Sequence, residues 1–256
     1  MISAAQLALL ALAGVATGAV NALAGGGTLI SFPLLLAMGV PPLTANVTNT
    51  IALCPGYLGA TFAQRRELRD QASRLYALLP IAVACSLGGA MLLLHTGEHA
   101  FGRAVPWLIL IACVLLGAQQ RLRAWLETRE SPRAGPGMHM PLALPLVGAA
   151  NVYGGYFGAG ASVIVLAALG LSYTDTLPRL NALKQALSLT TNCAAALLFA
   201  ASGPVNWRVV PVLAAGALLG GAWGGELSRR LSPRLLRNVV VLLGLVVAAI
   251  YLWRAD

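Results

Sequence analysis

Seven long apolar stretches constrain the fold of this sequence more than any other feature. They occupy residues 3–24, 43–64, 75–94, 104–118, 177–201, 209–227 and 238–253. Most are close to the roughly 20 residues that an α-helix needs to cross a bilayer. Only 10% of the residues are charged, against about 25% in an average soluble domain. We therefore predict an all-α integral membrane protein whose surroundings are the lipid bilayer.

Basic residues gather between these stretches. The chain has 17 Lys+Arg against 8 Asp+Glu. Since cytoplasmic loops of membrane proteins are enriched in Lys and Arg, this excess indicates topology and not a nucleic-acid partner. We predict that residues 65–74, 121–139 and 229–237 are cytoplasmic and that both termini are outside. No basic segment or clear cleavage site marks a signal peptide, so we expect the first stretch to stay in the mature protein.

The two halves of the sequence repeat the same order of motifs. A glycine cluster opens each half, at Asn21-Ala-Leu-Ala-Gly25-Gly26-Gly27 and at Asn151-Val-Tyr-Gly154-Gly155-Tyr-Phe-Gly158-Ala-Gly160. About a dozen apolar residues follow, and each run ends in an expected turn, at Gly39-Val-Pro-Pro and at Gly170-Leu-Ser-Tyr. Such self-similarity indicates a duplication. We predict a first transmembrane repeat over 1–120, a cytoplasmic linker over 121–139 and a second transmembrane repeat over 140–256.

The Arg-rich loop lies at a different position in each half. Four Arg occur in residues 65–74 and one in 95–103, whereas 202–208 hold one and 229–237 hold four. Opposite orientation of the halves explains this, and inversion requires an odd number of crossings per half. We predict two inverted repeats, each a Gly-broken, re-entrant helical hairpin followed by three transmembrane helices. Residues 28–39 support the break, because about 18 Å of helix cannot cross about 30 Å of hydrocarbon. The alternative is that the glycines only let helices pack closely.

Lys184 is the only lysine, and it lies inside the apolar stretch 177–201. A charge at that depth costs roughly 2.5–3.5 kcal/mol on insertion scales, so it indicates a functional site facing the helix bundle. Helical spacing puts further polar side chains on the same face, namely Asn181, Gln185, Ser188, Thr191 and Asn192. We predict that Asn181, Lys184, Gln185 and Ser188 bind substrate. The alternative is a lysine near a helix end that snorkels to the interface.

A second polar face is expected in the first half. Its substrate-binding candidates are Asn46, Asn49 and Thr50. Backbone N–H groups at helix N-termini are expected to complete the site at Gly26, Gly27 and Gly158. Together the faces offer many donors, one cation and no carboxylate, which favours an oxyanion over a metal cation. The alternative is that the amides and hydroxyls of the first half only bond helix to helix.

No residue set typical of catalysis, metal binding or cofactor binding occurs. The sequence has no Walker loop, no H-E-x-x-H and no G-x-S-x-G. The four Cys are interpreted as small hydrophobic residues, because none has a CxxC or His-partnered spacing. Asp175 and Glu226 are expected to pair with Arg at helix ends and not to relay protons. We therefore expect no enzyme activity and no cofactor.

Two motifs resemble a known family. The first runs Asn46-Val-Thr-Asn-Thr-Ile-Ala-Leu-Cys-Pro55-Gly56-Tyr57-Leu-Gly59 and continues at Arg65-Arg66-Glu67-Leu68. The second comprises Asn151 to Gly160 and Leu180-Asn181-Ala-Leu-Lys184. Over essentially the whole chain, these residues resemble the sulfite exporter TauE/SafE family of bacterial permeases. The resemblance implies a multi-pass transporter of the inner membrane for sulfite, sulfoacetate or other sulfonates. The chain departs from the pattern at Thr48-Asn49, where many members have Thr-Ser.

These observations predict a secondary transporter of small anions, because no ATP site is present and polar faces of two repeats would meet inside the membrane. An anion channel and a membrane-embedded enzyme are the alternatives. Lys184 is expected to recognise the anion's charge. Because burial disfavours an ammonium whereas a nearby anion favours it, anion binding should be linked to uptake of a proton at Lys184. Coupling to another ion is the alternative. The sequence leaves the particular anion, the direction of transport and a homo-oligomer open.

Overall fold

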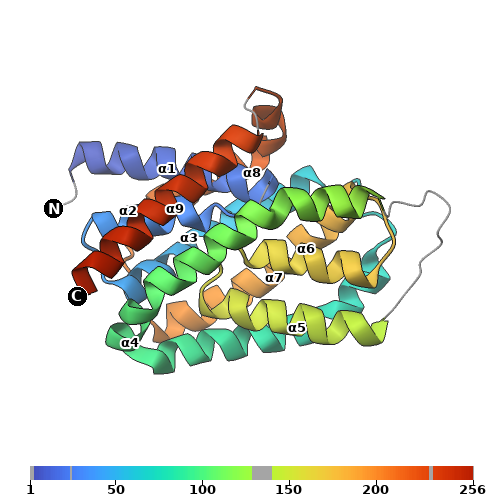
Figure 1. The fold of residues 1–256 in the computed structure, drawn as a ribbon, viewed down its shortest axis with the longest axis horizontal. Coiled ribbons are helices and arrows are strands. Elements are labelled where there is room, and N and C mark those ends of the chain that lie inside the picture. The colour runs from blue at the N-terminus through green and yellow to red at the C-terminus, as the bar shows by residue number, and fades with distance from the viewer. Residues whose placement is uncertain (1–2, 24, 129–139, 231–232, 256) are drawn as a thin grey trace.

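A computed structural model describes residues 3–23, 25–128, 140–230 and 233–255, and the regular elements of this part are α-helices (Figure 1). They are α1 (Ala4–Leu23), α2 (Thr28–Ala37), α3 (Pro42–Ala63), α4 (Ala72–Thr128), α5 (Met140–Tyr156), α6 (Ala161–Ser172), α7 (Leu177–Ser202), α8 (Val210–Arg230) and α9 (Pro233–Ala255). Nearly all residues of the apolar stretches lie in these helices, which confirms the all-helical prediction for the described residues. Residues 129–139 of the expected linker lie outside the described residues, whereas residues 121–128 continue α4.

Helix α4 reverses its direction within one element. Gly97 has φ 74° and ψ 166°, which lies outside the helical region, so residues 72–96 and 98–128 form two arms (Figure 1). A glycine tolerates this positive φ, whereas a side chain there would be strained. We expected an Arg-poor loop over 95–103. The structure replaces it with helical turns on both sides of a single glycine.

Glycines interrupt the first apolar segment of each half, as the sequence predicts. Gly25 has φ 81° between α1 and α2, and Gly158 and Gly160 have φ 78° and 76° between α5 and α6. The helices after the breaks contain only 10 and 12 residues. At 1.5 Å per residue they are about 15 and 18 Å long, which is too short to cross a bilayer.

Both apolar runs end at the expected turn residues, but only Gly39 makes its turn itself. Gly39 has φ 80° in the connection between α2 and α3, as expected. Gly170, however, lies inside α6, and the chain leaves the helix only after Ser172. A Cβ added at Gly170 would collide with the Leu126 side chain of α4. This glycine therefore provides space for a neighbouring helix and makes no turn.

Two helix pairs join the halves through glycines. In α1 and α8, Gly14 faces Leu213 and Gly216, and Gly18 faces Ala217 and Gly221, so the two helices run parallel. In the first arm of α4 and in α5, the pairs are Cys85 with Gly148 and Ser86 with Gly155, again in parallel order. Small residues allow such close backbone approach. Each pair therefore combines the first helix of one half with a later helix of the other.

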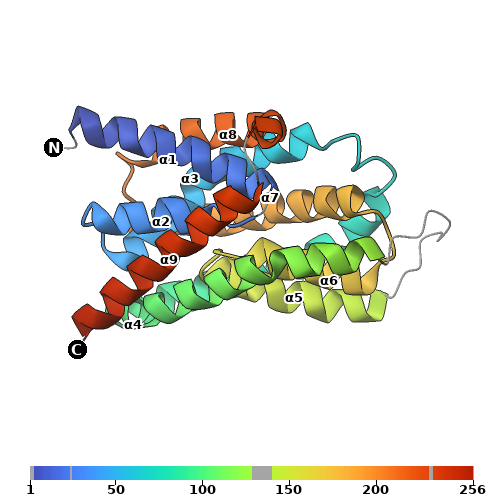
Figure 2. The same cartoon turned by 45° about the horizontal axis from the view of Figure 1, so that its top comes forward.

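The two pairs lie on opposite sides of α7. Figure 2 shows α1 and α8 along one edge of the molecule and α4 with α5 along the other, while α7 runs between them. Both termini lie at one end, and the ends of α4 and α5 that flank residues 129–139 lie at the opposite end (Figure 1). Helix α7, which carries Lys184, is therefore central.

Large apolar side chains are exposed along the outer helices. Leu12 of α1, Val114 of α4 and Trp253 of α9 are 69%, 71% and 83% exposed. By length and apolar composition alone, two described helices could span a bilayer, Ala4–Ala22 and Ala72–Thr128; shorter apolar helices accompany them. Extended apolar surface on a folded chain indicates contact with a partner or a membrane. The helices and their exposed surface are those of a membrane protein.

Candidate functional site

Lys184 is fully buried in the central helix α7. The helix begins at Leu177, after an extended Thr176 and with a proline in its first turn, where the missing N–H removes no helical hydrogen bond. Lys184 Nζ donates a hydrogen bond to Asn181 Oδ1 at 2.7 Å, as residues three apart on one helical face can. Neither ion pair of the described part involves Lys184. The lysine therefore points into the protein and not to an interface.

Asn181 connects this lysine to a cavity. Its Nδ2 donates to Gln64 Oε1 at 2.5 Å, while its Oδ1 accepts from Lys184. Both amide residues line a cavity of about 360 Å³, near the last residues of α3 and the first of α7. The cavity is lined by Ala22, Ala63, Gln64, Glu67, Arg123, Leu177, Pro178, Asn181 and Gly221. Lys184 lies behind its wall, shielded by the Asn181 amide.

The two glycine breaks meet next to Lys184. Ser162, at the start of α6, donates from Oγ to the Gly25 carbonyl oxygen at 2.5 Å. A Cβ added at Gly25 would collide with Ser162 Oγ and lie 3.8 Å from Lys184 Nζ. Gly25, Gly26 and Gly27 are buried. Breaks from both halves of the sequence thus border one ammonium group.

Gly27 does not present a free N–H group to this point, and Gly26 packs tightly against α4. Gly27 N–H already donates to Asn21 Oδ1 at 2.8 Å. A Cβ at Gly26 would collide with the Leu116 side chain of α4, so Gly26 provides packing space. Gly158 borders a separate, smaller cavity.

Gln185 holds the end of α1 in place. Its Nε2 donates to the carbonyl oxygens of Asn21 and Ala22, both at 3.0 Å. These carbonyls belong to the last turn of a helix, where intrahelical partners are missing. Gln185 Oε1 is buried without a hydrogen-bond partner in the described part. Gln185 is next to Lys184 in the sequence, and its main role is therefore to cap the C-terminal end of α1.

The predicted face of α3 contacts other helices and not Lys184. Asn46 Nδ2 donates to the Tyr156 carbonyl oxygen of α5 at 3.0 Å. Thr50 Oγ1 donates to the Asn46 carbonyl oxygen, and the Thr50 carbonyl accepts from Asn192 of α7 at 2.9 Å. Asn49 is buried, and its Oδ1 has no partner in the described part. No hydrogen bond among the described residues links this face to Lys184.

A second cavity is lined by Ser162, whose hydroxyl donates a hydrogen bond to the Gly25 carbonyl. Its volume is about 30 Å³, which is room for little more than one or two water molecules. Ser188 and Gly158 line it, as do polar residues that the sequence analysis did not select, among them Tyr57, Ser86, Asn151 and Ser162. This cavity is therefore far smaller than the one that Asn181 lines.

Three cavity residues were also missed by the sequence analysis: Gln64, Glu67 and Arg123. Arg123 was interpreted as a topological loop residue, yet it lies in the second arm of α4 and its charge acts on Lys184. Gln119 and Arg123 are four residues apart after an apolar stretch. This spacing on one helical face is a signal that could have found Arg123.

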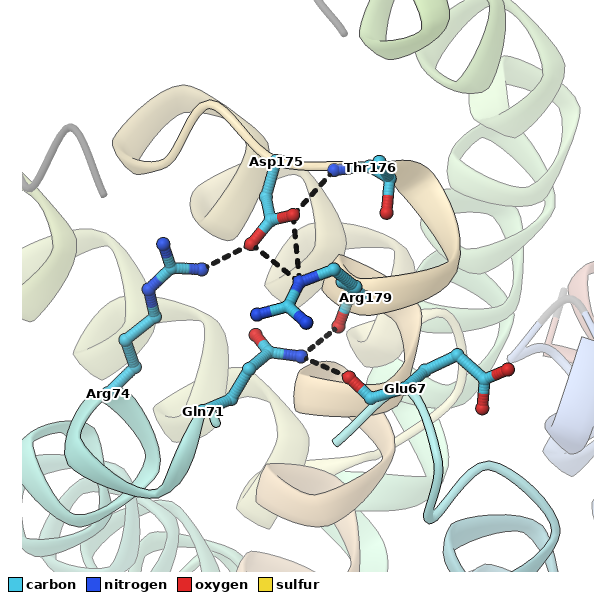
Figure 3. A network of polar contacts seen from close by, with 6 residues as sticks. All are labelled: Glu67, Gln71, Arg74, Asp175, Thr176 and Arg179. Carbon is cyan, nitrogen blue, oxygen red and sulfur yellow. Dashed lines mark hydrogen bonds and ion pairs between the residues drawn. The ribbon is translucent and has the colours of Figure 1, made fainter. Parts of the chain in front are cut away.

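An ionic network joins α4 to the start of α7 (Figure 3). Arg74 and Arg179 both pair with Asp175, at 2.5 and 3.0 Å. Gln71 Nε2 donates to the carbonyl oxygens of Glu67 and Arg179. Burial alone raises the pKa of Asp175, but hydrogen bonds from Arg74, the Thr176 N–H and Arg179 outweigh it and hold this pKa below its usual range. The predicted pairing of Asp175 with Arg is confirmed, whereas the Glu226 side chain lies outside the described residues.

Comparison with known proteins identifies a family whose sequence model matches this chain. Residues 10–251 match the sequence model of the family described as "Sulfite exporter TauE/SafE". The chain is 28% identical to the "Probable membrane transporter protein YfcA" of Escherichia coli (strain K12) over 253 residues, which cover 97% of this chain and 90% of the relative. It is 30% identical to a "Probable membrane transporter protein" of Haemophilus influenzae over 246 residues, covering 95% and 93%. No solved structure matches.

Proposed function

The chain belongs to the sulfite exporter TauE/SafE family, and we propose on that basis that it is a secondary transporter exporting small anions across the inner membrane of a bacterium. Its relatives are named probable membrane transporters. Sulfite and organosulfonates are the substrates that the family description and the site chemistry favour. Three observations support this proposal: the apolar helices of a membrane protein, membership of a transporter family, and a buried lysine.

The burial of Lys184 carries the anion assignment. The ammonium is 0% exposed and its hydrogen-bond partner is the neutral amide of Asn181. A buried charge is costly unless an opposite charge pairs with it. A small oxyanion would supply that charge, and the Asn181 amide could donate a hydrogen bond to it once its bond to Gln64 breaks. Uptake of a proton with the anion is part of the proposal, because burial disfavours the ammonium in the empty site.

The helix pairs support two inverted repeats. The parallel pair of α1 with α8 has its counterpart in the parallel pair of α5 with the first arm of α4. A two-fold relation between the halves would exchange these pairs. The short helices α2 and α6 would then be the re-entrant parts, each followed by three crossings. Transporters of this type bind substrate where broken helices of two inverted repeats meet.

The cavities favour a transporter over a channel. The large cavity reaches Asn181, the hydrogen-bond partner of Lys184, where α3 ends and α7 begins, while the cavity lined by Ser162 and Ser188 holds only about 30 Å³. A channel needs a continuous pore, whereas a site that is accessible from one side at a time is typical of alternating access.

Flux measurements on proteoliposomes test the proposal. Purified protein should transport sulfite or sulfoacetate with saturation and should exchange labelled for unlabelled anion. Lys184→Met keeps the length and the apolar stem of the side chain but removes its charge, so saturable flux should be lost. Lys184→Arg keeps the charge in a planar fork and should change selectivity without complete loss.

Arg121→Met provides the control, because Arg121 is an exposed cation of α4 that lines neither cavity. Its flux should equal that of the wild type. Unchanged affinity in Lys184→Met would remove Lys184 from the site. Flux that rises linearly with concentration would favour the channel.

A further inference from the structure

The 360 Å³ cavity combines chain segments that are far apart in sequence. Gln64 and Glu67 come from the end of α3 and the following turn, Arg123 from α4, and Asn181 from α7. Its volume lies at the lower end of the range for small-molecule sites. Figure 3 shows the Glu67 carboxylate pointing away from Arg74, Asp175 and Arg179. The ionic network therefore leaves this carboxylate to the cavity.

Arg123 gives the cavity a cation that suits an oxyanion. The planar guanidinium can hold two oxygens of one anion at once, which an ammonium cannot do in the same fixed geometry. Arg123 and Asn181 line the same cavity, and Lys184 bonds Asn181, so two basic side chains lie near this cavity; two cations brought this close repel each other. An anion placed near both cations relieves this repulsion. The electrostatics therefore favour an anion in the cavity as well as beside Lys184.

Asn181 lies between the cavity and Lys184. Its amide is held on both sides, by donation to Gln64 and by acceptance from Lys184. An anion moving from the cavity toward the ammonium must displace this amide. Breaking the bond to Gln64 frees the Asn181 NH₂ to donate to the anion as it passes.

We propose that this cavity is the docking site of the transported anion, that Arg123 holds the anion there, and that the Gln64–Asn181 hydrogen bond is the gate between the cavity and Lys184. The inference rests on the proposed transport function and adds a second anion site to it. Glu67 weakens the hold of Arg123, since its negative charge opposes the anion. Docking that is too tight would slow transfer to Lys184, as conduction through selective pores also requires moderate binding.

Kinetics from the cavity side test the docking site. In proteoliposomes of known orientation, sulfite or sulfoacetate is supplied on the side of the membrane on which residue 69 is accessible. The flux of the anion to the other side is then measured. Arg123→Gln should raise KM at least tenfold while Vmax stays within twofold, because only docking is weakened. Glu67→Gln should lower KM, which a merely structural role of these residues would not produce. Arg121→Gln, two residues away and exposed, should match the wild type.

Equal KM values for Arg123→Gln and Arg121→Gln would overturn the docking site. An absence of saturable flux in the wild type would overturn the proposed function itself. The two failures are therefore distinguishable.

Chemical labelling tests the gate without any transport. In a variant whose four native cysteines are replaced, Lys184→Cys reports access to the lysine position through its reaction with an anionic sulfonate thiol reagent. Adding Gln64→Leu should speed this reaction at least tenfold, since the Asn181 amide loses its acceptor. Adding Gln120→Leu should not, because Gln120 does not line the cavity. Equal rates in all three proteins would overturn the gate.

Discussion

Asp175 holds two helices together at the end of the molecule where α3 meets α4. Its carboxylate pairs with Arg74 of α4 and Arg179 of α7. Asp175→Asn keeps the shape of the side chain but removes both ion pairs. We expect a loss of about 1–3 kcal/mol in the free energy of unfolding, because a partly buried charge-assisted network loses the charge of its acceptor. Thermal unfolding of the purified protein measures this difference.

The same variant has a pH signature. Because the pKa of Asp175 is held below its usual range, its stabilisation is fully present above the unfolded pKa of about 3.9 and is lost as the pH falls through the folded value. The stability difference between wild type and Asp175→Asn should be constant near neutral pH and shrink in acid. A difference that is the same at all pH values would contradict a charged role.

At this scale the sequence was informative about Lys184 and not about its neighbours. A lone lysine in an apolar stretch is costly, so its burial inside the bundle could be predicted. Gln185 shares its helical face, yet α1 ends beside it and takes its amide. Gln64 lies at the end of an apolar stretch with no distinguishing spacing. Which neighbour each polar group meets depends on packing between helices. Local sequence patterns do not predict that packing.

Close glycine contacts join the helices in pairs, and adjacent glycines can separate packing from helix propensity. A Cβ added at Gly89 would collide with the Val152 carbonyl oxygen of α5, whereas nothing lies within 4 Å of one at Gly88. Gly89→Ala should therefore lower the free energy of unfolding by about 1–3 kcal/mol through overpacking. Gly88→Ala should be neutral or stabilising by up to about 1 kcal/mol. Thermal unfolding in one detergent compares the two variants, and equal effects would argue against a tight α4–α5 contact.

At the element scale, the glycine clusters identified both helix breaks because they recur at equivalent places. Single glycines were less informative. Gly39 makes a turn with positive φ, while Gly170 makes room for Leu126 inside a helix. Both uses rest on the missing Cβ, so the sequence alone cannot tell them apart without knowledge of the neighbouring helix.

For the whole molecule, the inverted arrangement predicts which loops share a side of the membrane. Single cysteines at positions 69 and 232 should be labelled from the cytoplasm by an impermeant thiol reagent in the cysteine-free variant. A cysteine at position 207, between α7 and α8, should be labelled from outside. The loop charges motivate this expectation. Labelling of position 232 from the outside, with position 69 inside, would contradict the inversion.

The pairing of α1 with α8 also bears on synthesis of the chain. Gly14 packs against Gly216, which the ribosome adds roughly 200 residues later, or about 10–40 s at ordinary translation rates. During that interval the glycine-lined face of the first helix has no permanent neighbour. The nascent protein therefore needs lipid, the insertion machinery or a temporary helix partner to cover it. Chains truncated before α8 should be recognised by membrane proteases as incomplete.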